Sequence, residues 1–228
     1  YILDRTPEME SQYYEFNMTR APFINVKVRK AFSYPIDREK IGENTLNGEA
    51  YGPGFFGICP QGLQGYDNTK DTMYSFNPQK AKKLLAEAGY PNGKNFPAIK
   101  IELNSGGAKH ARVVDEIQKQ LKAVLNINVE YDIVPFKQKL EDAKFARSDI
   151  FRSAWIADFP SPENFLWVLY GANVPDNLTE PSYPNIPRYK NEAYDKEFEA
   201  GKSAKTLEES YTHFKKAEKI MMEDAPIM

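Results

Sequence analysis

Residues 149–171 hold the side chains best suited to binding chemistry. The segment begins DIFRSAWI, an apolar run interrupted by Arg152, and Asp158 follows shortly after the run ends. Apolar residues fall on both faces of this run, which predicts a strand covered by helices on each side. Open α/β sheets bind ligands outside the carboxyl ends of their strands, so Arg152 and Asp158 mark a candidate ligand site. A guanidinium within an apolar strand needs a carboxylate partner, which Asp149 or another internal acid could supply.

The sequence offers little support for catalysis or for a metal. Neither Gly-x-Ser-x-Gly nor His-Glu-x-x-His occurs, and the chain has two histidines, His110 and His213, and one cysteine, Cys59. A hydrolase that pairs Asp158 with a second carboxylate is a competing hypothesis, which an assay of peptide turnover would decide. We expect neither an enzyme nor a bound cofactor, and the scattered histidines disfavour a metal cargo.

Length and composition indicate an ordinary globular chain. With 228 residues it can bury a core without disulfides or metals. The charged fraction is 27% and the net charge is −2, which gives the chain as a whole no electrostatic reason to bind nucleic acid or an anionic membrane. No apolar run approaches the ~18 residues of a membrane span. The chain starts at Tyr1 and ends at Met228 just after a predicted helix, and we interpret these ends as those of a fragment.

Residues 98–156 predict a β-α-β-α-β unit. Strands and helices alternate over residues 98–104, 109–125, 127–134, 136–143 and 149–156. Such units favour parallel strands with right-handed crossovers, so the loops after residues 104, 134 and 156 should emerge at one edge of the sheet. His110 lies in the first turn after the first strand. It is therefore expected on the same rim as Asp158.

The flanking regions complete the expected architecture. A strand at 12–18 precedes helices near 25–34, 37–46 and 77–88, and two helices fill 190–224. In the first helix, Lys27, Arg29 and Lys30 should face solvent. In the last helix, the apolar residues from Leu207 to Met221 should face the core. The helix at 136–143 should bury Phe136, Leu140 and Ala143. We therefore predict an α/β fold, with residues 1–228 as one lobe built on a mostly parallel sheet with helices on both faces.

Three segments resemble, in order, motifs of the extracytoplasmic solute-binding proteins that serve oligopeptide and dipeptide ABC importers (family 5). They are APFINVKVRKAFSYPIDREKI at 21–41, NPQKAKKLLAEAGY at 77–90 and WIADFPSPENFL at 155–166. The resemblance extends from about Tyr13 to Pro226 and implies a periplasmic-binding-protein-like fold. Family members are longer and fold as two lobes around a cleft. The resemblance therefore implies the C-terminal lobe of such a protein, without its N-terminal lobe.

The family resemblance also implies a function. Such a chain would be the substrate-binding component of an ABC importer, capturing short peptides between two lobes and delivering them to a membrane permease. It would work in the periplasm or at the outer face of the bacterial cytoplasmic membrane, in some cases as a lipoprotein. Its partners would be the peptide, the N-terminal lobe and the permease. Nickel, an oligosaccharide or another small solute remains possible as cargo, as does a sensor lobe that docks on a receptor, because fold does not fix function.

Peptide-binding members of the family imply roles for residues 154–158, at the end of the predicted strand and just beyond it. The aspartate of their Trp-x-x-Asp motif pairs with the α-ammonium group of the ligand, which places that role on Asp158. The backbone of Ala154 and Ile156 would add the peptide as an extra strand. Trp155 would either wall a side-chain pocket or belong to the core.

Arg152 and His110 fall at positions that lie near the C-terminal carboxylate of the ligand in some oligopeptide binders. The resemblance therefore implies that both residues help to bind that group. The competing interpretation gives Arg152 an internal carboxylate partner and leaves Asp158 as a solvated loop residue. Family members often have an acid where Ser161 stands, so no specificity is assigned to that position.

Overall fold

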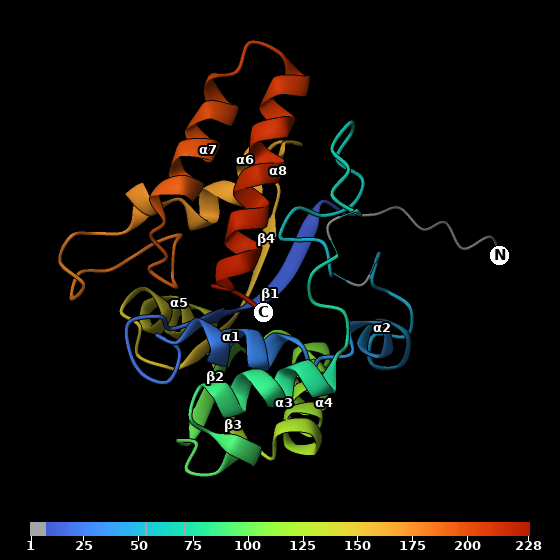
Figure 1. Ribbon diagram of the computed structural model, residues 1–228, viewed down its shortest axis with the longest axis vertical. Coiled ribbons are helices and arrows are strands. Elements are labelled where there is room, and N and C mark those ends of the chain that lie inside the picture. The colour runs from blue at the N-terminus through green and yellow to red at the C-terminus, as the bar shows by residue number, and fades with distance from the viewer. Residues whose placement is uncertain (1–7, 53, 71) are drawn as a thin grey trace.

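A four-stranded sheet forms the centre of the computed structural model, which describes residues 8–52, 54–70 and 72–228. The strand order is β1-β4-β2-β3. The strands are β1 (Glu10–Phe16), β2 (Ile99–Asn104), β3 (Val129–Val134) and β4 (Ile150–Ile156). Strands β2, β3 and β4 are parallel, whereas β1 runs antiparallel to β4 (Figure 1). The predicted parallel β-α-β-α-β unit is thus confirmed.

Helices surround the sheet and begin close to the predicted positions. They are α1 (Val26–Ser33), α2 (Arg38–Lys40), α3 (Pro78–Glu87), α4 (Ala108–Leu125), α5 (Phe136–Lys144), α6 (Pro162–Leu166), α7 (Glu192–Ser203) and α8 (Leu207–Asp224). Side chains that accept a hydrogen bond from the first turn cap six of them: Asn25, Asp37, Asn77, Ser161, Asn191 and Thr206. Such caps satisfy backbone N–H groups that have no partner within the helix. Among the helices of the described ranges, none is long and apolar enough to cross a membrane.

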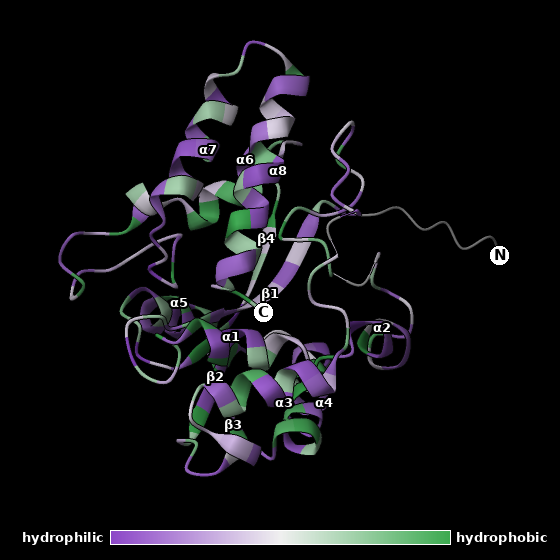
Figure 2. Cartoon of the chain, viewed as in Figure 1, coloured by the Kyte–Doolittle hydropathy of each residue, from purple (hydrophilic) through white to green (hydrophobic). Residues whose placement is uncertain are grey.

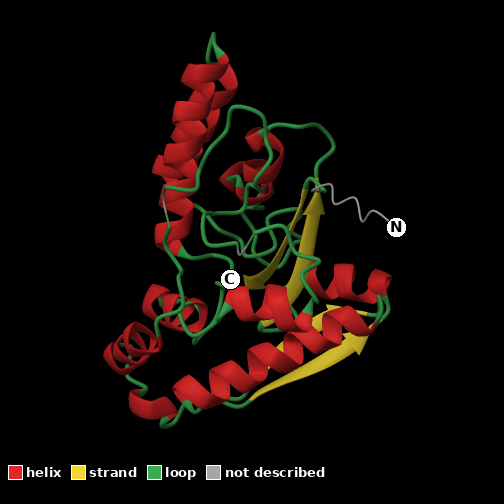
Figure 3. Ribbon diagram, turned by 90° about the vertical axis from the view of Figure 1, so that its right-hand side faces the viewer, coloured by secondary structure: helices red, strands yellow, loops and turns green. Residues whose placement is uncertain are grey.

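The two faces of the sheet differ in polarity. One face carries the apolar residues of β2, Ile99, Ile101 and Leu103, and buries them in a core that also holds residues of α1 and α4 (Figure 3). The opposite face carries Glu15 and Ser153 and is covered by α5, which contacts β2. Helices therefore lie on both faces, as predicted.

Helix α5 turns a different side to the sheet from the one predicted. Ala143 is buried, as predicted, but Phe136 is 58% exposed, and Lys139 and Asp142 are buried instead. Lys139 donates a hydrogen bond from Nζ to Ser153 Oγ at 2.9 Å, and Ser153 in turn donates to Glu15. The sheet face that α5 covers carries Glu15 and Ser153 as well as Phe151, so the helix buries Lys139 beside Ala143.

Helices α7 and α8 form an antiparallel hairpin that projects from the rest of the molecule in Figure 1. Tyr194 and Phe198 of α7 and Phe214 of α8 are buried between them, as predicted. The helices approach closely at Gly201, where a Cβ atom would lie 2.5 Å from Cε1 of Phe214. The prediction was wrong for Leu207, which is 72% exposed, because this first residue of α8 lies at the tip of the hairpin.

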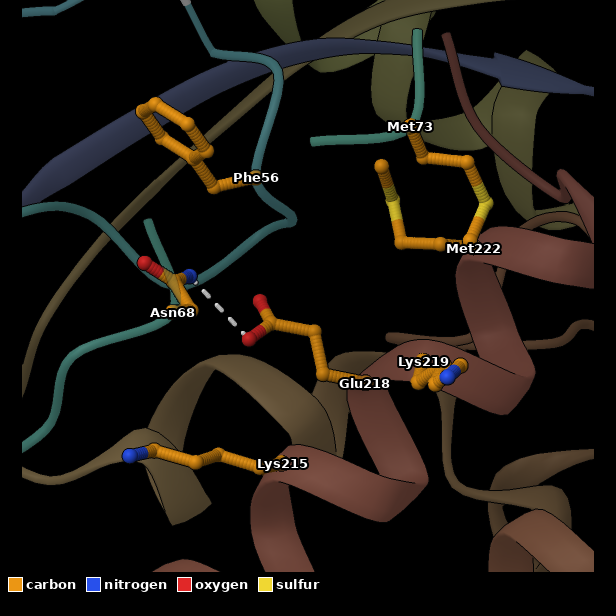
Figure 4. A pocket seen from close by; sticks show the side chains of 7 residues that line it. All are labelled: Phe56, Asn68, Met73, Lys215, Glu218, Lys219 and Met222. Atoms are coloured by element: carbon orange, nitrogen blue, oxygen red, sulfur yellow. Dashed lines mark hydrogen bonds between the residues drawn. The ribbon is translucent and has the colours of Figure 1, made fainter. Parts of the chain in front are cut away.

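Arg29 and Glu218 are further charged residues that are buried although the sequence did not identify them as such. Arg29, expected to face solvent, is buried and donates to the carbonyl oxygens of Phe23 and Asp224, which joins the start of α1 to the end of α8. Glu218 of α8 accepts hydrogen bonds from the backbone N–H of Cys59 and from Asn68 Nδ2 (Figure 4). These contacts attach the long loop between α2 and α3 to the helical hairpin.

Candidate ligand-binding site

Strand β4 has a free edge over its last residues. Its pairing with β2 covers only Ile101↔Ile150 and Glu102↔Phe151, whereas its pairing with β1 extends from Ile150 to Ile156. Beyond Phe151, β4 therefore has a strand neighbour on one side only among the residues that the structure describes. The part of β4 that pairs with β1 alone is its carboxyl end, next to which the sequence predicted the ligand site.

Backbone hydrogen bonds define which groups face the open edge. The N–H of Asn17 in the segment after β1 donates to the carbonyl of Asp149, and the N–H of Ala157 donates to the carbonyl of Met9. Since successive residues of a strand point their N–H and C=O groups to opposite sides, Ala154 and Ile156 point away from β1. Neither has a strand partner on that side among the described residues. The backbone predicted to pair with a ligand is thus available for pairing.

Burial decreases along β4 in the same direction. Ile150 and Phe151 are fully buried, Trp155 is half-buried and Ile156 is 59% exposed. The prediction that helices cover both faces was therefore wrong for the second half of the strand. Phe159, which follows it, is also exposed.

Asp158 lies in the turn between β4 and α6. Its backbone N–H donates to Asn164 Oδ1 at 3.1 Å, and the same oxygen accepts from Trp155 Nε1 at 2.8 Å. Asn164 thereby fixes the turn relative to the tryptophan, a role that its sequence position did not reveal. The Asp158 carboxylate is exposed and has no hydrogen bond or ion pair with any residue of the described ranges. Burial raises the pKa of the Tyr183 hydroxyl, and the charges of Glu15 and Asp158 raise it further.

Aromatic side chains surround this carboxylate turn. The rings of Trp155 and Trp167 are 6.0 Å apart between centroids. Trp167 is 37% exposed, and Tyr183 is exposed as well. The arrangement places Trp155 between core and solvent. Whether it contacts a ligand remains a prediction.

Arg152 has neutral hydrogen-bond partners. Its Nη2 donates to Gln12 Oε1 at 2.8 Å, and its Nη1 lies 3.4 Å from Asn104 Oδ1. Asp149 instead accepts from Arg20 Nη2 at 2.9 Å and from the backbone N–H of Lys100. The alternative in which Asp149 neutralises Arg152 is therefore wrong, and no other described carboxylate forms an ion pair with Arg152. Burial lowers the pKa of this guanidinium.

His110 lies close to Arg152 at the start of α4. Burial lowers the pKa of its imidazole, and the charge of Arg152 lowers it further. Its Nδ1 is buried and has no hydrogen-bond partner among the described residues. Gly106 leaves room for the ring, because a Cβ atom there would lie 2.8 Å from Cε1 of His110. A neutral imidazole can donate one hydrogen bond and accept another.

The candidate residues form two groups. Arg152 and His110 line one cavity of about 500 Å³, together with residues of β1 and of the loop after α2. Asp158, Trp155, Ala154 and Ile156 are not among its described lining residues. Asp158 comes six positions after Arg152 in the chain, a span of about 20 Å at 3.3 Å per residue. The site thus has a cationic end, an anionic end and an open strand edge between them.

This arrangement suits recognition rather than metal binding. Among the described residues there is no group of three or more His, Cys, Asp or Glu side chains that could hold a metal ion. An extended peptide has an ammonium group, a main chain with unpaired N–H and C=O groups, and a carboxylate. The anionic turn, the free edge of β4 and the Arg152 guanidinium complement these groups in that order.

Comparison with known proteins identifies the family. The family model "Bacterial extracellular solute-binding proteins, family 5 Middle" matches residues 2–177. The chain belongs to this family. The resemblance of the three sequence motifs is thus confirmed, and so is the predicted fold class.

The relatives of this family 5 chain are binding proteins. The oligopeptide-binding protein OppA of Bacillus subtilis is 29% identical over 94% of this chain, and heme-binding protein A of Haemophilus influenzae is 30% identical over 94%. An oligopeptide-binding protein of Borrelia burgdorferi has a solved structure that is 30% identical and superimposes over 96% of this chain with a TM-score of 0.83. The family 5 chain spans 38% of the length of each of the two curated relatives and 42% of the solved chain.

Proposed function

We propose that this chain is one lobe of an ABC-importer substrate-binding protein, which captures short peptides between two lobes and delivers them unchanged to a membrane permease. The observation that carries the proposal is the free edge of β4, which lies between a carboxylate and a guanidinium without ionic partners among the described residues. A second lobe would close over the bound peptide. The protein would work outside the cytoplasmic membrane, because its family is described as bacterial extracellular solute-binding proteins.

Asp158 would bind the amino terminus of the peptide. Opposite charges about 4 Å apart attract by about 4 kcal/mol at an effective dielectric constant of about 20, before desolvation is subtracted. Because the carboxylate of Asp158 has no ionic partner within the described ranges, a ligand ammonium group would not have to displace one. The exposed position of Asp158 suits closure by another lobe, which would exclude water and strengthen the pair.

The backbone of Ala154 and Ile156 would hold the main chain of the peptide. Strand addition uses groups that every peptide has, so it supports binding of many sequences. At the other end, Arg152 would bind the carboxylate and His110 would donate a hydrogen bond. The pKa of His110 is lowered by burial and by the charge of Arg152, so the imidazole is neutral at neutral pH and adds no second positive charge.

The role of Asp158 is testable with paired ligands in the complete two-lobed protein. In Asp158→Asn, peptides with a free amino terminus should bind at least about tenfold more weakly in titration calorimetry, which corresponds to about 1.4 kcal/mol. The same peptides with an acetylated amino terminus should lose much less. Asp176→Asn, which changes an exposed loop carboxylate elsewhere, should affect neither ligand. Equal losses for both ligands in Asp158→Asn would remove Asp158 from this role.

A different cargo is the second candidate. The relative named heme-binding protein A is about as similar to this chain as the oligopeptide-binding relatives are, so family membership alone does not select a peptide. Mass spectrometry of the molecules that copurify with the complete protein would separate the two. Peptides of varied sequence would support strand addition at β4, whereas one non-peptide compound would contradict it.

A further inference from the structure

Helices α1 and α3 together present a surface of five lysines, here called the lysine face. The residues are Lys27, Lys30, Lys80, Lys82 and Lys83. The helices lie antiparallel and in contact (Figure 1). At one end the N–H of Asn77 donates to the carbonyl of Tyr34, and at the other Lys27 pairs with Glu87 at 2.9 Å. The two helices therefore bring together lysines from elements far apart in the sequence, of which Lys27, Lys80, Lys82 and Lys83 are exposed and Lys30 is partly exposed.

The lysines project from the outer side of the helix pair. Ala81 and Leu85 bury the inner side of α3, whereas its three lysines are exposed. In α1, Val28 and Phe32 are buried, and Lys27 is exposed. Figure 2 shows hydrophilic segments, coloured purple, in both helices.

The positive charge of this surface is poorly compensated. Glu87 is the single acidic residue within α1 and α3. Within the described part of the chain, Lys30, Lys82 and Lys83 form no ion pair, and Lys80 lies 4.3 Å from the centroid of the Tyr34 ring. By contrast, α7 and α8 carry nine acidic side chains and five lysines. The net charge of −2 is thus the sum of a basic region and an acidic region, so it does not exclude a negatively charged partner for the basic region.

The exposed cations of this surface are lysines rather than arginines, which favours some kinds of partner over others. Arginine is the residue that recognises phosphates and carboxylates by paired hydrogen bonds, and lysine is depleted in the cores of protein interfaces. Lysine is a hydrated point charge on a flexible chain, which suits a surface with diffuse negative charge. In α1 and α3 the exposed cations are all lysines, because Arg29 is buried.

Apolar side chains flank the lysine face at both ends. Ile24, just before α1, is 61% exposed, and Phe76, just before α3, is 48% exposed. Because the two helices are antiparallel, these residues lie at opposite ends of the pair. Basic side chains together with exposed apolar residues are the combination that binds the interface of an anionic bilayer.

We propose that the lysine face binds reversibly to a bilayer of anionic phospholipid, with Ile24 and Phe76 in contact with the headgroup region. This surface lies on different elements from the free edge of β4, so a bound ligand would not compete with lipid. Each lysine near such a surface adds a modest attraction that falls off within a Debye length, about 8 Å at 0.15 M salt and about 30 Å at 0.01 M. Binding should therefore be strong only at low ionic strength.

Cosedimentation with lipid vesicles tests the proposal on the 228-residue chain. Vesicles of phosphatidylglycerol mixed with phosphatidylcholine should sediment the chain at low ionic strength, and vesicles of pure phosphatidylcholine should not. The variant K30Q/K82Q/K83Q should bind these vesicles at least about tenfold more weakly than the parent chain does. The variant K196Q/K202Q/K205Q makes the same change in net charge with exposed lysines of the helical hairpin and should bind as the parent does.

Two further measurements keep the test decisive. Thermal unfolding should be the same for both triple variants, and K30R/K82R/K83R, which retains the charge, should restore vesicle binding. The proposal is overturned if the chain does not bind vesicles that contain phosphatidylglycerol, if it binds both kinds of vesicle equally, or if the two glutamine variants behave alike.

Discussion

The two halves of β4 have similar residues but differ in strand pairing and in burial. Ile150 and Phe151 pair with both neighbouring strands and are buried, whereas Ala154 and Ile156 pair with β1 alone and are partly or largely exposed. Apolar side chains occur in both halves, so hydrophobicity does not distinguish them. The difference arises because the pairing of β2 with β4 ends at Phe151. One strand thus serves as core at its start and as a candidate binding edge at its end.

Removing a side chain from each half should have very different effects on stability. Phe151→Ala should lower the free energy of unfolding by about 3–5 kcal/mol, because it leaves a cavity in the packed part of the sheet. Ile156→Ala should cost about 0.5 kcal/mol or less, because that side chain is already largely exposed. Chemical denaturation of both variants measures the difference. Similar losses would mean that the second half of β4 is also core.

Proline substitutions at neighbouring positions can test the free edge itself. Ser153→Pro removes an N–H that faces β1 and should cost about 3 kcal/mol or more. Ala154→Pro removes an N–H that faces the open side, so it should cost clearly less stability while it weakens peptide binding in the complete protein. Thermal unfolding and calorimetry together report both quantities. If Ala154→Pro destabilised the fold as much as Ser153→Pro does, the edge would not be free.

Local patterns in the sequence predicted the elements well. The helix predicted near 77–88 begins at Pro78 after its cap Asn77, because a cap acts through bonds within a few residues. The parallel order of β2, β3 and β4 also followed from the alternation of strands and helices. These features depend on neighbours along the chain, which a sequence displays directly.

Features that depend on distant neighbours could not be predicted in this way. Arg29 is buried because carbonyl groups at the end of α8 accept its hydrogen bonds. Helix α5 buries Lys139 because a serine and a glutamate lie across the sheet face from it. In the candidate site, the strand order predicted His110 on the same rim as Asp158, but His110 lines a cavity with Arg152, and Asp158 is not among the described residues that line it.

Glu15 of β1 lies beside Phe151 of β4 and accepts a hydrogen bond from Ser153, so its titration links the buried part of β4 to pH. Burial raises its pKa from 4.5 to about 7, although the charge of Lys139 and a hydrogen bond from Ser153 lower it in part. The folded state therefore holds this proton more tightly than the unfolded state does. The resulting stabilisation is complete below about pH 4.5 and is lost as the pH rises towards 7, by up to about 3 kcal/mol.

The variant Glu15→Gln removes this titration and should flatten the dependence of stability on pH between about 4.5 and 7. Denaturant unfolding across that range measures the slope for each protein. Glu130→Gln, at an exposed position of β3, serves as the control and should leave the slope unchanged. An identical slope in the parent and in Glu15→Gln would show that Glu15 is ionised in the folded state throughout.

Another small effect on stability is expected at Arg152, at the boundary between the two halves of β4. In Arg152→Gln the free energy of unfolding should change by about 1 kcal/mol or less, because the guanidinium has neutral partners and no ion pair with a described residue. Peptide binding by the complete protein should weaken by about tenfold or more for ligands with a free carboxylate, and much less for the same ligands with a C-terminal amide. Calorimetry with both ligands measures the ratio. A large loss of stability with no change in that ratio would make Arg152 a structural residue of the sheet and restrict the candidate site to the exposed end of β4.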